Sequence, residues 1–92
     1  GKNLPIEIEV RNLTELAEAL RVGNVHRIML DNFQIDTLKE AVKMVAGRFP
    51  TEASGGIRED TLRAVAETGV DYISCGALTH QIKSLDLSLK AY

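Results

Sequence analysis

The chain has 92 residues, of which 45% are hydrophobic and 26% charged. These are ordinary globular values, so we expect one domain over residues 1–92 and exclude a disordered tail. The formal net charge is −2 and the basic residues form no stripe, which argues against a nucleic-acid partner. No apolar run approaches the ~18 residues of a membrane span, so we expect no membrane partner and a cytoplasmic location. The first residue is Gly rather than Met, which favours a processed product or a piece of a longer protein.

The first half of the chain alternates strand and helix patterns. Residues 6–10 alternate apolar and acidic side chains and predict a strand. A helix is expected over residues 12–23, because Asn12 and Glu15 have capping-box spacing and Gly23 is a natural C-cap. The apolar run at 27–30 predicts a strand covered on both faces, and it ends at Asp31. A second helix follows, with an apolar stripe over 38–45 and its end at Gly47.

The second half continues this pattern with less regular elements. A weaker strand is expected from about residue 49 to 53, then a helix that ends at Gly69, then a strand over 70–75. After these we predict a short helical turn over 79–83 and a strand-like tail over 85–89. The sequence thus predicts an α/β fold of four βα units plus a tail.

The repeat predicts a half-barrel. Residues that close the strands recur at intervals of 22 or 23 residues: Glu9, Asp31, Ser54 and Gly76. Repeated right-handed βα crossovers build a parallel sheet. A complete (βα)8 barrel needs ~200 residues or more, so this chain can form half of a TIM-like barrel. An open four-stranded sheet of flavodoxin type is the alternative.

Both architectures bind ligands at the carboxyl ends of the parallel strands. Ser54, Gly55 and Gly56 follow one strand there, and backbone N–H groups in such a loop can hold a phosphate; the alternative is a tight turn that needs glycine. Gly76 and Ala77 form a second glycine loop one unit later, and two such loops favour phosphate binding.

Two acidic residues at the same strand ends are candidate catalytic groups. Glu9 lies near the end of the first strand and Asp31 at the end of the second, so together they could act on a cationic centre or a Mg²⁺ ion. The alternative is ion pairing with lysine or arginine, which is the interpretation we favour for Glu7 and Glu52.

Two further residues near the second glycine loop have weaker signals. His80 could donate to a phosphate or simply cap its helix. Cys75 is the only cysteine, which excludes an intrachain disulfide and a cysteine cluster for a metal. A small buried hydrophobic residue is therefore a better interpretation of Cys75 than a nucleophile.

Five segments, taken together and in order, resemble quinolinate phosphoribosyltransferase, an enzyme family of NAD biosynthesis. They are EIEV at 7–10, MLDNF at 29–33, EASGGI at 52–57, ETGVDYIS at 67–74 and GALTH at 76–80. The resemblance covers nearly the whole chain but only the C-terminal half of that enzyme's barrel. It implies transfer of a phosphoribosyl group, with Mg²⁺, from phosphoribosyl pyrophosphate to quinolinate, followed by decarboxylation.

The resemblance also implies roles for single residues. Glu9 and Asp31 would contact the ribose hydroxyls and stabilise positive charge at the anomeric carbon. Phosphate would be held by the two glycine loops, with Cys75 beside the second and His80 a weaker candidate: Ser54, Gly55, Gly56, Gly76 and Ala77. The chain departs from the family at Cys75, where Val is common, and at Arg11, where Glu is common.

The family's quinolinate-binding cations come from segments that this sequence lacks. We therefore expect a C-terminal fragment that is inactive alone and that forms a homo-oligomer or joins the missing barrel half. The alternative is an engineered or excised half-barrel folding module with no catalytic function, which at most binds phosphate.

Overall fold

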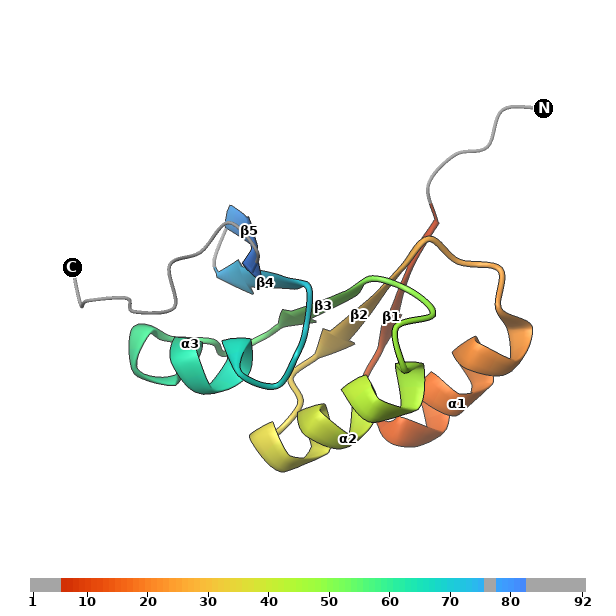
Figure 1. Ribbon diagram of the computed structural model, residues 1–92, viewed down its shortest axis with the longest axis horizontal. Coiled ribbons are helices and arrows are strands. Elements are labelled where there is room, and N and C mark those ends of the chain that lie inside the picture. The colour runs from red at the N-terminus through yellow and green to blue at the C-terminus, as the bar shows by residue number, and fades with distance from the viewer. Residues whose placement is uncertain (1–5, 76–77, 83–92) are drawn as a thin grey trace.

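The computed structural model describes residues 6–75 and 78–82 (Figure 1). Five strands and three helices follow one another in this part of the chain, and a helix separates each of the first three strands from the next. In chain order they are β1 (Glu7–Val10), α1 (Leu13–Val22), β2 (Arg27–Asp31), α2 (Ile35–Val45), β3 (Thr51–Ser54), α3 (Glu59–Ala66), β4 (Tyr72–Cys75) and β5 (Leu78–Gln81).

The strands form one sheet in the order β1-β2-β3-β4-β5. The first four are parallel neighbours, as the βα repeat predicts. The fifth pairs antiparallel with β4, so the predicted helical turn at 79–83 is wrong over residues 79–81, which belong to β5. Cys75 and Leu78 are register partners with two residues between them, a spacing that suits a hairpin and is far too short for a helical crossover. The predicted tail at 85–89 lies outside the described residues.

All three helices lie on the same side of the sheet, below it in Figure 1. This arrangement decides between the two architectures that the sequence left open. A flavodoxin-type sheet has helices on both faces and a reversal in strand order, whereas here the order is sequential. One covered face and sequential parallel strands are the features of half a barrel.

The hydrophobic core lies between the sheet and this single helix layer. The strand residues that contribute to it occupy alternate positions, as Ile28 and Leu30 do on β2. The buried core comprises Val10, Leu16, Ala19, Ile28, Leu30, Leu38, Ala41, Val45, Ala53, Val65, Ala66, Val70 and Ile73. The alternate strand residues point to the opposite face of the sheet, which no helix covers in the described part of the chain. We call this second face the open face.

The helix ends explain how the loops are held. Asn12 Oδ1 accepts from the Glu15 N–H at 2.8 Å, which confirms Asn12 as the N-cap of α1. Glu15 Oε1 accepts at 2.7 Å from the Arg11 N–H, one residue before the N–H that a full capping box would use. Gly23 ends this helix in the left-handed conformation, as expected. The C-cap of α2 is Ala46 rather than Gly47, so the predicted end is displaced by one residue.

Candidate functional site

The parallel strands end at one edge of the sheet, and this carboxyl edge carries the two predicted carboxylates. Asp31 is the last residue of β2 and is in register with Ser54, the last residue of β3. Glu9 is in register with Met29, which lies two residues before Asp31 on β2. Both carboxylates therefore lie on the open face of neighbouring strands. The Glu9 side chain is 46% exposed and that of Asp31 28%, so both can reach a ligand.

Direct contacts join these residues into one group. The Ser54 hydroxyl donates to Asp31 Oδ1 at 3.2 Å, which fixes one carboxylate oxygen. Arg11 lies beside both acids, with Nη2 3.7 Å from Glu9 Oε2 and Nε 3.9 Å from Asp31 Oδ2. We call Glu9, Arg11, Asp31 and Ser54 the rim cluster. Arg11 was not among the predicted site residues, although its position two residues after Glu9 indicated the same side of the chain.

Gly55 is required by the close approach of two loops. Its φ is +86°, and a Cβ atom at this position would lie 2.9 Å from the backbone nitrogen of Asn32 and from Asp31 Oδ1. The Asn32 N–H donates to the Ser54 carbonyl at 2.7 Å, so the ends of β2 and β3 are held together here. The tight-turn interpretation of Gly55 is therefore correct, whether or not the loop also binds phosphate. Gly56 has a φ of +66° and more space, with Asn32 Oδ1 3.7 Å from its hypothetical Cβ.

The helix after this loop begins beyond the two glycines. Arg58 is the N-cap of α3, and Thr61 Oγ1 accepts from its backbone N–H at 3.0 Å. The glycines thus precede the helix by several residues instead of forming its first turn. Asp60 lies in that first turn and is exposed, and its charge competes with an anion for the positive end of the helix dipole. A phosphate at Ser54, Gly55 and Gly56 must therefore depend on loop amides more than on the helix dipole.

The remaining predicted site residues are not brought into the rim cluster. Cys75 ends β4 and packs against the core, and burial raises the pKa of its thiol, in agreement with a small hydrophobic role. His80 is in register with Ile73, two residues back from the carboxyl edge. Opposite residues of an antiparallel pair share a face, and Ile73 is buried in the core, so His80 lies on the helix side of the sheet. Gly76 and Ala77 lie outside the described residues.

A second charged group lies nearer the amino ends of the strands on the open face. Arg27 Nη1 is 2.9 Å from Glu52 Oε1 and 3.9 Å from Glu7 Oε2, and its guanidinium lies 3.9 Å from the centre of the Tyr72 ring. The Glu52 side chain is only 4% exposed. Burial raises the pKa of Glu7 and the neighbouring Glu52 carboxylate raises it further, against the opposing charge of Arg27. The structural interpretation of Glu7 and Glu52 is therefore supported.

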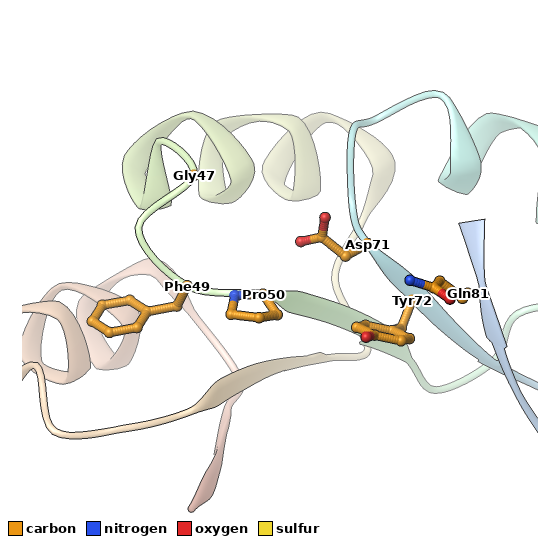
Figure 2. Close-up of a pocket in the computed structure, with 6 residues that line it drawn as sticks. All are labelled: Gly47, Phe49, Pro50, Asp71, Tyr72 and Gln81. Atoms are coloured by element: carbon orange, nitrogen blue, oxygen red, sulfur yellow. The ribbon is translucent and has the colours of Figure 1, made fainter. Parts of the chain in front are cut away.

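Two hollows lie at the amino ends of the strands, away from the rim cluster. One, of about 270 Å³, is lined by Gly47, Phe49, Pro50, Asp71, Tyr72 and Gln81 (Figure 2). Figure 2 shows Asp71 on the helix side and Tyr72 on the other side of the chain. Asp71 Oδ2 accepts from the Thr51 N–H at 2.9 Å, so this carboxylate is used to join the starts of β3 and β4. The other, of about 380 Å³, is lined by Ile6, Glu7, His26, Arg27 and Pro50.

We assign the site to the carboxyl edge rather than to these hollows. In βα barrels the amino ends of the strands serve stability and the carboxyl ends serve chemistry.

Within residues 6–75 and 78–82, no group of three or more His, Cys, Asp or Glu side chains could hold a metal ion. No helix of this part of the chain is long and apolar enough to cross a membrane.

Comparisons with known proteins agree with this geometry. Residues 1–90 match the family model "Quinolinate phosphoribosyl transferase, C-terminal domain". The chain is 46% identical over 101 aligned residues to a chloroplastic nicotinate-nucleotide pyrophosphorylase (carboxylating) of Oryza sativa subsp. japonica, covering 95% of this chain and 27% of that protein. It is 43% identical to a mitochondrial quinolinate phosphoribosyltransferase (decarboxylating) of Nicotiana tabacum, covering 92% of this chain and 28% of that protein.

A solved structure gives the same result. The nicotinate-nucleotide pyrophosphorylase of Francisella tularensis superposes with a TM-score of 0.75 at 41% identity, over 82% of this chain and 27% of that one. The chain thus spans less than a third of the length of the relatives that it matches. Because the family model covers nearly every residue, the chain belongs to the family of the quinolinate phosphoribosyl transferase C-terminal domain.

Proposed function

We propose that this chain supplies the ribose- and phosphate-binding part of a quinolinate phosphoribosyltransferase site. The reaction transfers a phosphoribosyl group from phosphoribosyl pyrophosphate to quinolinate and yields nicotinate mononucleotide, pyrophosphate and CO2. The observation that carries the proposal is the rim cluster: two accessible carboxylates and a hydroxyl meet at the edge where barrels bind ligands, in a chain of this family.

The carboxylates suit a sugar that develops positive charge. When the bond to the pyrophosphate group breaks, the anomeric carbon becomes oxocarbenium-like, and anionic groups fixed nearby stabilise it. A unit positive charge about 4 Å from a carboxylate gains about 4 kcal/mol at an effective dielectric constant of about 20. Ser54 donates to one oxygen of Asp31 and leaves the other acceptor positions for ribose hydroxyls. Glu9 and Asp31 thereby bind the sugar and stabilise its charge, and Ser54 orients Asp31.

The residues of the rim cluster also fit a Mg²⁺ ion that arrives with its substrate. Mg²⁺ is commonly bound by one or two carboxylates together with substrate phosphates, rather than by a cage made of protein alone. Glu9 and Asp31 are such a pair, and the described residues offer no larger acidic group. When bound, the ion would neutralise phosphate charge beside these two side chains.

We further propose that the chain is inactive alone. Arg27 lies on the open face near the amino ends of the strands, and its contacts with Glu52 and Glu7 leave it poorly placed to hold the two carboxylates of quinolinate. The orientation of two reactants can account for ~7 to 11 kcal/mol of a barrier, so the loss of one binding site removes most of the rate. A partner that completes the barrel, or a second copy of the chain, would be needed.

Self-association is expected to use the β1 edge. This strand has one neighbour in the described sheet, whereas β5 already occupies the free side of β4. An exposed strand edge beside an uncovered face favours pairing with another chain. Closure of an eight-stranded barrel from two copies would require displacement of β5, so pairing at β1 is the simpler assembly. A cytoplasmic location stays a prediction.

The experiment compares binding and turnover on the full chain. Ribose 5-phosphate is titrated while amide NMR shifts are followed for the wild type, for Asp31→Asn and for Asp36→Asn, a matched change at an exposed residue of α2. We expect Asp31→Asn to weaken binding about tenfold, as the loss of a charged hydrogen-bond acceptor does, and Asp36→Asn to leave it unchanged. Equal effects of the two variants would contradict the proposal.

The turnover assay with quinolinate and phosphoribosyl pyrophosphate should give no nicotinate mononucleotide above background. Product formation by the purified chain would refute the proposed inactivity. Absence of ribose 5-phosphate binding together with absence of turnover would favour a folding module without a site.

A further inference from the structure

Arg11 is the one member of the rim cluster for which the proposed function gives no role. Its guanidinium lies within 4 Å of two carboxylates, yet neither distance, 3.7 Å or 3.9 Å, is short enough for a hydrogen bond. The side chain is 70% exposed. Its contacts with Glu9 and Asp31 are therefore electrostatic and loose, and the N–H donors of its guanidinium remain available.

The backbone beneath this side chain is held in place. The Arg11 N–H donates to Glu15 Oε1 at 2.7 Å, and the next residue, Asn12, is the N-cap of α1. The bond from its own N–H to Glu15, next to the N-cap of α1, thus anchors the base of a long side chain at the carboxyl edge. A cation that is fixed at its base and free at its tip can contact a ligand without reorganisation of the backbone.

The position of Arg11 along the edge indicates which part of a ligand it meets. Arg11 follows β1, whereas the Ser54 to Gly56 loop follows β3, and the two carboxylates lie between them on β1 and β2. Neighbouring strands are about 4.8 Å apart, so these two ends are separated by about 10 Å along the edge. A ribose that carries phosphate groups at both ends spans this kind of distance. With the 5-phosphate at the glycine loop, the substituent at the anomeric carbon points to the Arg11 end.

Charge favours a protein cation at that end in addition to Mg²⁺. A diphosphate beside Glu9 and Asp31 brings like charges together, which disfavours binding unless a positive group lies between them. Arg11 already lies beside both acids, and a planar guanidinium can hold phosphate oxygens in a bidentate manner. We propose that Arg11 binds the diphosphate group of the sugar substrate and so distinguishes phosphoribosyl pyrophosphate from ribose 5-phosphate. This inference rests on the proposed function.

The test measures dissociation constants of the full chain for phosphoribosyl pyrophosphate and for ribose 5-phosphate by NMR titration, each with Mg²⁺. The variants are Arg11→Gln, Arg11→Lys and, as a matched control, Arg21→Gln. Arg21 is as exposed as Arg11, at 70%, and pairs with Glu18 on α1, so its loss changes the net charge equally. We expect Arg11→Gln to weaken the binding of phosphoribosyl pyrophosphate about tenfold, which is the loss expected for a charged hydrogen bond. The affinity for ribose 5-phosphate should stay unchanged.

Further readouts separate a binding role from a structural one. Arg11→Lys should fall between the wild type and Arg11→Gln, because lysine keeps the charge but loses the bidentate geometry. The Arg11 Nε–H resonance should shift with phosphoribosyl pyrophosphate but not with ribose 5-phosphate. The inference is overturned if Arg11→Gln weakens the binding of both ligands equally or of neither. It is also overturned if Arg11→Gln and Arg21→Gln change the two dissociation constants to the same extent. If the wild type binds neither ligand, the proposed function itself fails. If the wild type binds both ligands but Arg11→Gln shows no selective loss, only the inference about Arg11 fails.

Discussion

Substitution of Gly55 by alanine tests the close approach that holds the candidate site together. At a φ of +86° an L residue is strained, which costs about 1–2 kcal/mol. The added Cβ would also lie 2.9 Å from the Asn32 backbone nitrogen, so the two loops must move apart. That movement breaks the 2.7 Å bond from the Asn32 N–H to the Ser54 carbonyl, a loss of about 0.5–1.5 kcal/mol. We expect a total destabilisation of about 1.5–3.5 kcal/mol.

Gly47→Ala is the matched control, because Gly47 has a similar φ of +77° and no atom within 4 Å of its hypothetical Cβ. This control should lose only the conformational part, about 1–2 kcal/mol. Urea unfolding followed by far-ultraviolet circular dichroism measures both variants, and the difference between them isolates the close approach. Equal destabilisation of Gly55→Ala and Gly47→Ala would show that the reasoning about the loop contact is wrong.

Three other predictions concern the charges of the open face and the strand edge. Arg27→Met should destabilise the chain by about 3 kcal/mol in urea unfolding, because it leaves buried Glu52 unpaired. The double variant Arg27→Met with Glu52→Leu should recover most of this loss, and additive losses of the two changes would contradict the prediction. Because the pKa of Glu7 is raised in the folded state, the folded state binds the proton of this carboxyl more tightly than the unfolded state does. Protonated Glu7 therefore adds to the free energy of unfolding in full below the unfolded pKa of 4.5, and this contribution is lost as the pH rises through the folded pKa. Glu7→Gln should remove this part of the pH dependence when the free energy of unfolding is measured against pH. The same pH dependence in the wild type and in Glu7→Gln would count against the prediction. Sedimentation equilibrium should show self-association that grows with concentration, whereas a monomer at all concentrations would rule out pairing at the β1 edge.

Sequence periodicity was sufficient for the parallel part of the fold. Alternation at 6–10, the apolar run at 27–30 and the capping pair of Asn12 and Glu15 are local signals, and each corresponds to an element in the structure. Which side of the sheet the helices cover is not a local property, and so the barrel and flavodoxin interpretations both fitted the sequence. The antiparallel β5 was missed because the segment from Leu78 to Gln81 is short and gains its hydrogen bonds only from β4.

The candidate site was predictable in composition but not in contacts. Regular spacing brought Glu9, Asp31 and Ser54 to one edge, because strand ends of a βα repeat coincide. Spacing does not report side-chain direction, so Arg11 was not among the predicted site residues although it approaches both acids. His80 was predicted to lie at the start of a helical turn, but it belongs to β5, and its register with Ile73 turns it toward the other face. The steric need for Gly55 depends on Asn32, 23 positions earlier, and no local pattern could reveal it.

The central claim is that a ribose phosphate binds at the carboxyl edge of β1, β2 and β3. A crystal structure of the full chain grown with ribose 5-phosphate and Mg²⁺ tests it most directly. We predict sugar hydroxyls against Glu9 and Asp31 and the phosphate at the loop from Ser54 to Gly56. A ligand bound instead in the hollow beside Tyr72, at the amino ends of the strands, would contradict the account.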